Sequence, residues 1–386
     1  MKRAIRQCTA AFVAAALLLA QALPVWAQPG AVGDIPAKSG ILVEQNTGRV
    51  LYELNADEKM HPASITKVMT LLLVMEALDG GKISLEDKVT CSPNANSMGG
   101  SQIWLEVGEE MTVHELLKAT AISSANDAAC ALGEHLAGSE DAFVDLMNRR
   151  AQELGMTNTH FENTNGLDAD GHLSTARDIS IMSRELLKHE KIKEYTTVWM
   201  DSLRDGKTQL VNTNRLIRFY KGATGLKTGT TDGAGSCLSA SATRGNLSLV
   251  AVTMGSSTSD ERFNAARTLL DYGFANYEAV QPPSIQEQLT PVKVLGGVER
   301  QVEVQFVPPM PVVVEKGGGS SITQEIQLAE DVHAPVEQGE VLGSVTVLVE
   351  GTPVSRYDLT AASGVERMTF LKGLETLWEA ASRMNS

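Results

Sequence analysis

The chain has 386 residues, of which 33 are basic and 47 are acidic, and its formal net charge is −14. So acidic a surface repels phosphates and argues against a nucleic-acid partner. The length predicts two or more domains. The sequence contains no Cys-x-x-Cys or His-x-x-x-His pair, so a metal site has little support and we expect no cofactor.

Residues 1–27 have the pattern of a secretory signal peptide. Lys2, Arg3 and Arg6 form a basic start, an apolar run follows from 10 to 23, and Ala27 supplies a small residue for cleavage. The apolar run is short for a membrane-spanning anchor. We therefore expect an exported protein.

Three cysteines follow the signal peptide, namely Cys91, Cys130 and Cys237. An odd number is a poor basis for a disulfide framework in a secreted protein. We expect them to be buried, unpaired thiols.

The mature chain begins with a predicted hairpin and a buried helix. Residues 38–44 and 49–53 have strand character, and Asn46-Thr47-Gly48 between them favours a turn. A helix is predicted from Pro62 to Leu78, where two glycines end it. It is apolar almost all round, and such a helix is buried in a core.

The middle third is predicted to be helical. Thr112 with Glu115 forms a capping box for a helix that ends near Ile122. The polar segment 123–127 interrupts this helix, which then resumes to Leu136. Two further helices are predicted, over 139–155 and 174–187.

Strand character returns after residue 234. Segments 235–243 and 247–254 flank Arg244-Gly245-Asn246 and predict a second hairpin, and a helix follows over 260–277. Strands at both ends with helices between them indicate an α+β domain over residues 28–280. We expect one antiparallel sheet with a helical lobe.

Beyond residue 280 the composition changes. Short alternating segments predict a small all-β domain over 281–362; they are 301–306, 311–315, 322–328, 341–350 and 353–360. Residues 363–386 predict an amphipathic helix, whose apolar face comprises Phe370, Leu371, Leu374, Leu377, Trp378 and Ala381.

Ser64 and Lys67 are the first residues with catalytic potential. Three residues apart on a helix, they share one face. A serine needs a base to take its proton, and burial favours the neutral form of a lysine. On its own this spacing is common by chance.

Two other short motifs follow. Ser124-Ala125-Asn126 places polar groups inside an apolar helical region, where Ser124 could relay a proton and Asn126 could hold a substrate amide. Lys227-Thr228-Gly229 offers a positive charge, a hydroxyl and a glycine that lets a ligand approach the backbone. Each motif alone is weak.

In this order the three motifs are a rare conjunction, typical of penicillin-binding proteins and serine β-lactamases. The chain most closely resembles the D-alanyl-D-alanine carboxypeptidases, the low-molecular-mass penicillin-binding proteins, over nearly all of its mature length. Segments 61–67, 161–167 and 174–178 are similar to the family's nucleophile segment, mid-domain loop and following helix start. Thr230 and Asn165 stand where some relatives carry histidine.

The resemblance implies catalytic roles. Ser64 would attack the carbonyl between the two terminal D-alanines of a peptidoglycan stem peptide, with Lys67 as the acylation base. The backbone N–H groups of Ser64 and Thr230 would form the oxyanion hole. Ser124 and Lys227 would share the proton relay and electrostatic stabilisation.

The resemblance also implies substrate contacts. Asn126 would bind the peptide, and Gly229 would let it approach the backbone. Thr228 and Arg262 would hold the terminal carboxylate, which suits the paired donors of a guanidinium. β-Lactam antibiotics would acylate Ser64 as substrate mimics. The terminal helix would attach the enzyme to the outer face of the cytoplasmic membrane.

Other functions fit parts of the sequence. A class A-like β-lactamase needs a carboxylate to activate water, and Glu162 lies in roughly the right stretch. A non-catalytic peptidoglycan-binding protein could keep the same site. Transpeptidases and endopeptidases act on the same bond type, and the sequence does not separate them from a carboxypeptidase.

Overall fold

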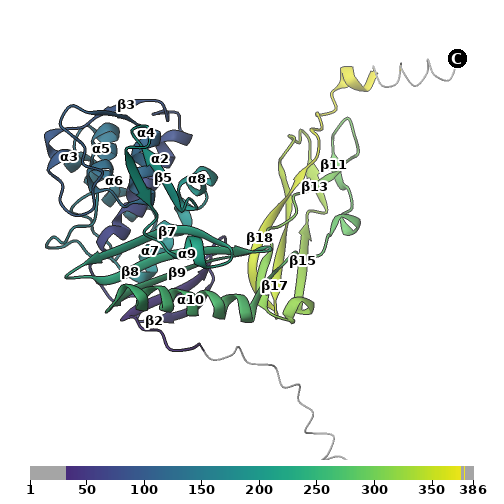
Figure 1. Cartoon of the computed structure of the whole chain (residues 1–386). Helices are drawn as coiled ribbons and strands as arrows, with labels where there is room; N and C mark the ends of the chain where they lie inside the picture. Colours follow the sequence, from purple (N-terminus) through teal and green to yellow (C-terminus); the bar gives the residue numbers. More distant parts are fainter. Residues whose placement is uncertain (1–31, 375–377, 379–386) are drawn as a thin grey trace, which may run out of the picture. The chain divides into compact units, whose positions relative to one another are not determined.

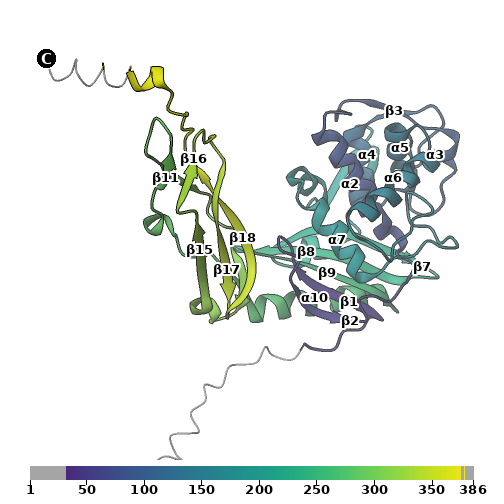
Figure 2. The ribbon, with the colours of Figure 1, turned by 180° about the vertical axis from the view of Figure 1, so that it is seen from behind.

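We analysed a computed structural model of the chain, which describes residues 32–374 and 378. These residues are coloured by sequence in Figures 1 and 2. The predicted signal peptide, residues 1–27, lies outside the described residues. So do Leu377 and Ala381 of the predicted terminal helix.

A five-stranded antiparallel sheet organises the first domain. The strand order is β2-β1-β9-β8-β7, so the two predicted hairpins are neighbours through β1 and β9, although some 200 residues separate them in the chain. Both hairpins are confirmed. The strands are β1 Ser39–Glu44, β2 Val50–Leu54, β7 Ala223–Thr231, β8 Gly235–Arg244 and β9 Leu247–Ser256.

Helices cover both faces of this sheet. Helix α10 (Ser259–Asn276) lies on one face and α7 (Ala176–Leu186), with the helical lobe beyond it, lies on the other (Figures 1 and 2). Strand β8 is buried over most of its length, as expected for a strand covered on both sides. A capping box of Thr258 and Glu261 fixes the start of α10.

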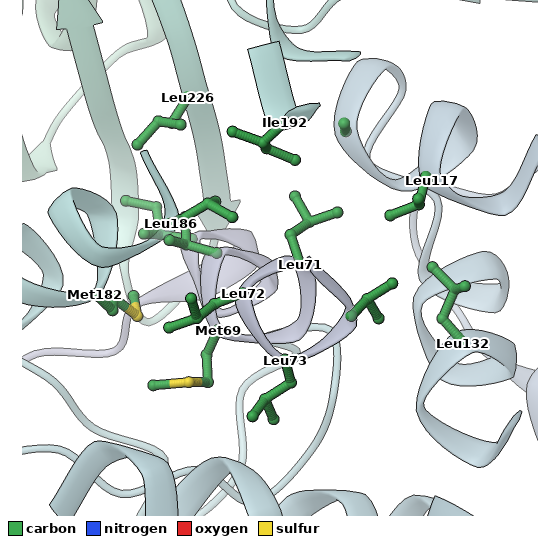
Figure 3. Packing of buried hydrophobic residues seen from close by; sticks show 14 of the residues in the cluster. Met69, Leu71, Leu72, Leu73, Leu117, Leu132, Met182, Leu186, Ile192 and Leu226 are labelled. Atoms are coloured by element: carbon green, nitrogen blue, oxygen red, sulfur yellow. The ribbon is translucent and has the colours of Figure 1, made fainter. Parts of the chain in front are cut away.

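Helix α2 (Lys67–Asp79) is the centre of the helical lobe. Ten of its thirteen residues are buried, which confirms the predicted buried helix. Figure 3 shows Met69, Leu71 and Leu72 of α2 surrounded by apolar side chains from other helices and from β7. The surrounding helices are α4 Val113–Ile122, α5 Asn126–Ala137, α6 Glu140–Glu153 and α7.

The predicted capping box is confirmed. Thr112 and Glu115 form both of its bonds at α4. Ser139 and Thr175 also cap the starts of α6 and α7. Gly138 ends α5 in a left-handed conformation, with φ of 89°.

The expectation of a wholly helical middle third is wrong in one place. Strands β5 (Met200–Leu203) and β6 (Thr208–Val211) form a hairpin there. Each has only four residues, too few for a clear alternation of polar and apolar positions, and the burial of Leu203 and Leu210 in the core holds the hairpin in place. The short elements not yet given are β3 Lys88–Thr90, α3 Pro93–Ser97, β4 Glu110–Thr112, η2 Glu190–Ile192, α8 Lys193–Thr196 and α9 Leu216–Phe219.

The C-terminal part is a β-rich domain, as predicted. A four-stranded sheet has the order β13-β18-β17-β15, and a three-stranded one has the order β12-β11-β16. Val345 and Leu359 lie in its core. Its elements are β10 Tyr277–Val280, η3 Gln286–Gln288, β11 Val292–Leu295, β12 Gln301–Val302, β13 Val304–Phe306, β14 Val312–Glu315, η4 Gly318–Ser321, β15 Ile322–Leu328, β16 Asp331–His333, β17 Val341–Val349 and β18 Thr352–Ala361.

Residues 370–374 are helical. Their apolar side chains are exposed: Phe370 by 82% and Leu371 by 76%, with Trp378 at 79%. No helix within the described residues has both the length and the apolar character needed to cross a membrane. Cys91, Cys130 and Cys237 are buried free thiols, as predicted.

Candidate active site

Ser64 lies in a tight turn directly before α2. The turn is a 3-10 helix, η1 (Ala63–Thr66), and α2 itself begins at Lys67. The expectation of an α-helical turn at Ser64 is therefore corrected. Ala63 has a φ of 48°, a conformation that costs a non-glycine residue roughly 1–2 kcal/mol and persists only where the surroundings enforce it.

Lys67 has three oxygen neighbours. Its Nζ lies 3.0 Å from Ser64 Oγ, 2.6 Å from Asn126 Oδ1 and 2.7 Å from the Asn165 carbonyl oxygen. A neutral amine has two N–H donors and one lone pair. The two amide oxygens accept the donors, which leaves the lone pair for the hydroxyl proton of Ser64.

Burial favours the neutral form of that amine. The Lys67 side chain is fully buried, and desolvation lowers its pKa well below the ordinary value. The positive charge of Lys227 lowers the pKa further, and the negative charge of Asp127 opposes both effects. The structure thus brings the predicted serine and lysine into contact, and burial favours the form of the lysine that a base requires.

The Ser-x-Asn motif lies at the start of α5. Asn126 is buried, and besides accepting from Lys67 it donates from Nδ2 to the Gly99 carbonyl at 2.6 Å. Ser124 has a φ of 66° and is also buried. Within the described residues its hydroxyl makes no hydrogen bond to Ser64, Lys67 or Lys227.

The Lys-Thr-Gly motif lies inside β7. Lys227 is buried, and desolvation, followed by the nearby charge of Arg262, lowers its pKa to about 7. Its Nζ donates to the Thr228 carbonyl at 2.9 Å. Thr228 donates its hydroxyl proton to Thr213 Oγ1 at 2.7 Å.

Gly229 brings this strand against the nucleophile turn. A Cβ atom at Gly229 would lie 2.9 Å from Ser64 N and from Ala63 Cβ, closer than atoms pack. The glycine is needed for contact with the protein's own Ser64 segment, which differs from the expected role in ligand approach.

Arg262 reaches the end of the motif from α10. Its Nη1 donates to the Gly229 carbonyl at 3.0 Å and to Thr230 Oγ1 at 2.7 Å. Burial lowers the pKa of the guanidinium, while Thr230 is exposed. The arginine therefore contacts β7 at Gly229 and Thr230, the two residues that follow Thr228.

The predicted mid-domain loop, residues 161–167, continues in the structure to His172, and residues 161–172 are called the mid-domain loop below. It supplies groups that the sequence did not assign. The Asn165 carbonyl contacts Lys67, and Gly166 packs so closely that a Cβ atom there would lie 1.8 Å from the Ala63 carbonyl oxygen. Asp127, in α5 and outside this loop, is a second group that the sequence did not assign; it accepts hydrogen bonds from the backbone N–H groups of Ile103 and Leu105. The motif Asn-Thr-Asn-Gly-Leu was the signal for the loop, but a backbone carbonyl has no sequence signature.

Glu162 does not have the surroundings of a water-activating base. Its carboxylate lies 3.0 Å from His160 Nε2, and both side chains are largely exposed. This geometry does not support the β-lactamase alternative.

Comparisons with known proteins agree with this geometry. Residues 25–258 match the peptidase family described as D-alanyl-D-alanine carboxypeptidase, and residues 277–367 match the C-terminal domain of penicillin-binding protein 5. The chain belongs to the D-alanyl-D-alanine carboxypeptidase family. The resemblance inferred from the motifs is thereby confirmed.

Individual relatives extend over most of the chain. The carboxypeptidase DacF of Bacillus subtilis is 45% identical, covering 87% of this chain and 88% of its own length. The structure of penicillin binding protein 5 from Haemophilus influenzae has a TM-score of 0.75 at 30% identity, over 87% of this carboxypeptidase and 99% of that chain. Penicillin-Binding Protein D2 from Listeria monocytogenes, in an ampicillin-bound form, has a TM-score of 0.57 at 33% identity, over 62% and 98%.

Proposed function

We propose that Ser64 is the nucleophile of this carboxypeptidase and attacks the carbonyl between the two terminal D-alanines of a peptidoglycan stem peptide. The observation that carries the proposal is the contact of Ser64 Oγ with Lys67 Nζ at 3.0 Å. That lysine is fully buried and its pKa is lowered, so it can accept the hydroxyl proton as the C–O bond forms.

Charge then develops on the carbonyl oxygen. The N–H groups of Ser64 and Thr230 lie on the two segments that Gly229 holds together, and they would donate to this oxyanion. The C–N bond breaks, and the departing D-alanine amine takes up the proton that Lys67 accepted from Ser64, by way of Ser124 and Lys227. Water attacks the remaining ester, which releases the shortened peptide and restores Ser64.

Arg262 and Thr228 would hold the terminal carboxylate of the substrate. Thr230 joins them, because its exposed hydroxyl already accepts from Arg262. Asn126 contributes mainly by orienting Lys67, since its amide oxygen accepts from that lysine. β-Lactams carry a carboxylate beside a strained carbonyl, so they would acylate Ser64 in the same orientation.

Measurement of D-alanine release from a pentapeptide tests this function, with Ser64→Ala as the control. We expect release by the parent protein and none by the variant, and mass spectrometry after penicillin treatment should find the adduct on Ser64. No release of D-alanine by the parent protein, or rapid turnover of penicillin, would refute the proposed carboxypeptidase function. Adding an amine acceptor distinguishes hydrolysis from transpeptidation.

We also propose that the protein is exported and attached peripherally to the outer face of the cytoplasmic membrane. The exposed Phe370, Leu371 and Trp378 support this, because amphipathic helices bind membrane interfaces through such side chains. The proposed order is signal peptide 1–27, catalytic domain 28–280, a β-rich domain and an amphipathic helix. The predicted boundary between the last two, at residues 362 and 363, is corrected: Val365 and Arg367 form β-bridges with Val336 and Gly297, and helix begins only at Phe370. The pairing of β10 with β14 favours counting residues 277–280 with the β-rich domain.

Deleting the chain after Thr369 and fractionating cells tests the attachment. We expect the truncated protein to leave the membrane fraction and to keep its D-alanine release. Unchanged membrane association would contradict the proposal for the helix and leave that for Ser64 intact.

A further inference from the structure

A buried histidine joins the mid-domain loop to the nucleophile turn. His172 is only 1% exposed, and its Nε2 lies 2.8 Å from Thr66 Oγ1. Its Nδ1 accepts the backbone N–H of Glu162 at 3.0 Å. Because Nδ1 is an acceptor, the ring proton is on Nε2 and is donated to Thr66, so the imidazole is neutral.

Thr66 is a sensitive place for this contact. It lies between Ser64 and Lys67, at the end of the 3-10 turn and the cap of α2. The His172 carbonyl oxygen also lies 3.1 Å from His61 Nδ1, just before the same turn. The histidine therefore touches the nucleophile segment on both sides of Ser64.

The other end of the loop touches the reacting groups themselves. The Asn165 carbonyl accepts from Lys67, and Gly166 lies against the Ala63 carbonyl. The bond from Glu162 N–H to His172 closes this loop upon itself. A shift of the histidine would therefore move the Asn165 carbonyl, which is one of the three hydrogen-bond partners of Lys67.

We propose that His172 is a positioning residue, whose neutral imidazole holds the mid-domain loop against the nucleophile turn so that the Asn165 carbonyl stays on Lys67. This inference rests on the function proposed for Ser64 and Lys67. It gives a role in acylation to a side chain outside the three motifs.

The surroundings favour the neutral ring. Burial is the largest cause that lowers the pKa of His172 to about 4, His61 and His160 lower it further, and Asp168 opposes them. The carboxylate of Glu162 is turned to His160. A second ring proton on Nδ1 would point at the Glu162 N–H, and two donors would then face each other.

Two substitutions at one position test the proposal. The amide of His172→Gln offers an oxygen for the Glu162 N–H and an NH₂ for Thr66, whereas His172→Leu offers neither. The measurement is the acylation rate of full-length protein by a fluorescent penicillin across pH. His160→Gln is the matched control, because His160 lies directly before this loop and is exposed.

We expect His172→Gln and the control to stay near the parental rate. His172→Leu should acylate about 100-fold more slowly, the scale of a misplaced reacting group. The acid limb of its pH profile, where the acylation rate falls because Lys67 becomes protonated, should move to higher pH. The reason is that water reaching Lys67 would raise the pKa of that lysine. A loss of stability alone would leave the acid limb of the folded molecules unmoved.

A folded His172→Leu variant with the parental rate and an unmoved acid limb would overturn the proposal. If that variant does not fold, Thr66→Val removes the acceptor from the other side and should show the same loss. Where all variants fold, the losses of the Thr66 and His172 variants should be less than additive. Failure of the parent to acylate at Ser64 would instead refute the proposed function.

Discussion

Gly166 tests how tightly the mid-domain loop must fit the nucleophile turn. Its φ is 89°, and a Cβ atom added there would lie 1.8 Å from the Ala63 carbonyl oxygen. Gly171 belongs to the same loop and has a φ of 84°, but an added Cβ atom would meet only the Glu162 carboxylate, at 3.2 Å. The two glycines share a conformation and differ in what surrounds them.

This difference sets the expected magnitudes. The left-handed conformation costs an alanine roughly 1–2 kcal/mol at either position. At Gly166 the obstacle is backbone, so overpacking adds about 1–3 kcal/mol, whereas at Gly171 the half-exposed Glu162 side chain can rotate away. Both substitutions reduce the conformational entropy of the unfolded chain by the same amount. The difference between the two variants in free energy of unfolding therefore isolates the contact with Ala63.

Urea unfolding and penicillin acylation of both variants provide the test. We expect Gly166→Ala to unfold at the lower urea concentration and to acylate about 100-fold more slowly than the parent, since the Ala63–Ser64 turn must shift. Gly171→Ala should lose stability with little change in acylation. Equal effects of the two variants on both measurements would refute the role of close packing at Ser64.

Two further predictions concern charge. Lys227→Met removes a positive neighbour of Lys67 and should raise the pKa of that lysine, whereas Asp127→Asn removes a negative neighbour and should lower it. The pH below which the acylation rate falls should therefore be higher in the first variant and lower in the second. Shifts of this pH in the same direction in both variants would contradict the electrostatic account. The depressed pKa of His172, about 4 against an ordinary 6.5, means that the unfolded chain binds more protons between these values. Stability present above the ordinary pKa should therefore fall by about 3 kcal/mol as the pH drops to about 4, a slope that urea titrations of the parent should show and His172→Gln should lack.

Local patterns in the sequence were enough to predict much of the fold. The capping box at Thr112, the two hairpins and the uniformly apolar helix after Ser64 each involve neighbours in the chain, so their physics is visible in the sequence. The four-residue strands at 200–211 are held by tertiary contacts of Leu203 and Leu210. Their propensity alone does not decide their conformation.

The candidate site divides in the same way. Side chains with distinctive chemistry, such as Lys67 and Lys227, could be named from spacing and resemblance. The Asn165 carbonyl and the close approach at Gly229 could not, because every residue has a carbonyl and many glycines lie in open turns. Such groups become functional only through contacts between segments that are far apart in sequence.

The arrangement of positive charges suggests how substrate binding prepares the base. Arg262 lowers the pKa of Lys227, and Lys227 in turn lowers that of Lys67. In the proposed mechanism a substrate carboxylate at Arg262 offsets its charge, so the pKa of Lys227 rises from about 7 and this lysine becomes more fully protonated. Its stronger charge then favours the neutral form of Lys67, so binding the correct terminus would make the base more available at Ser64.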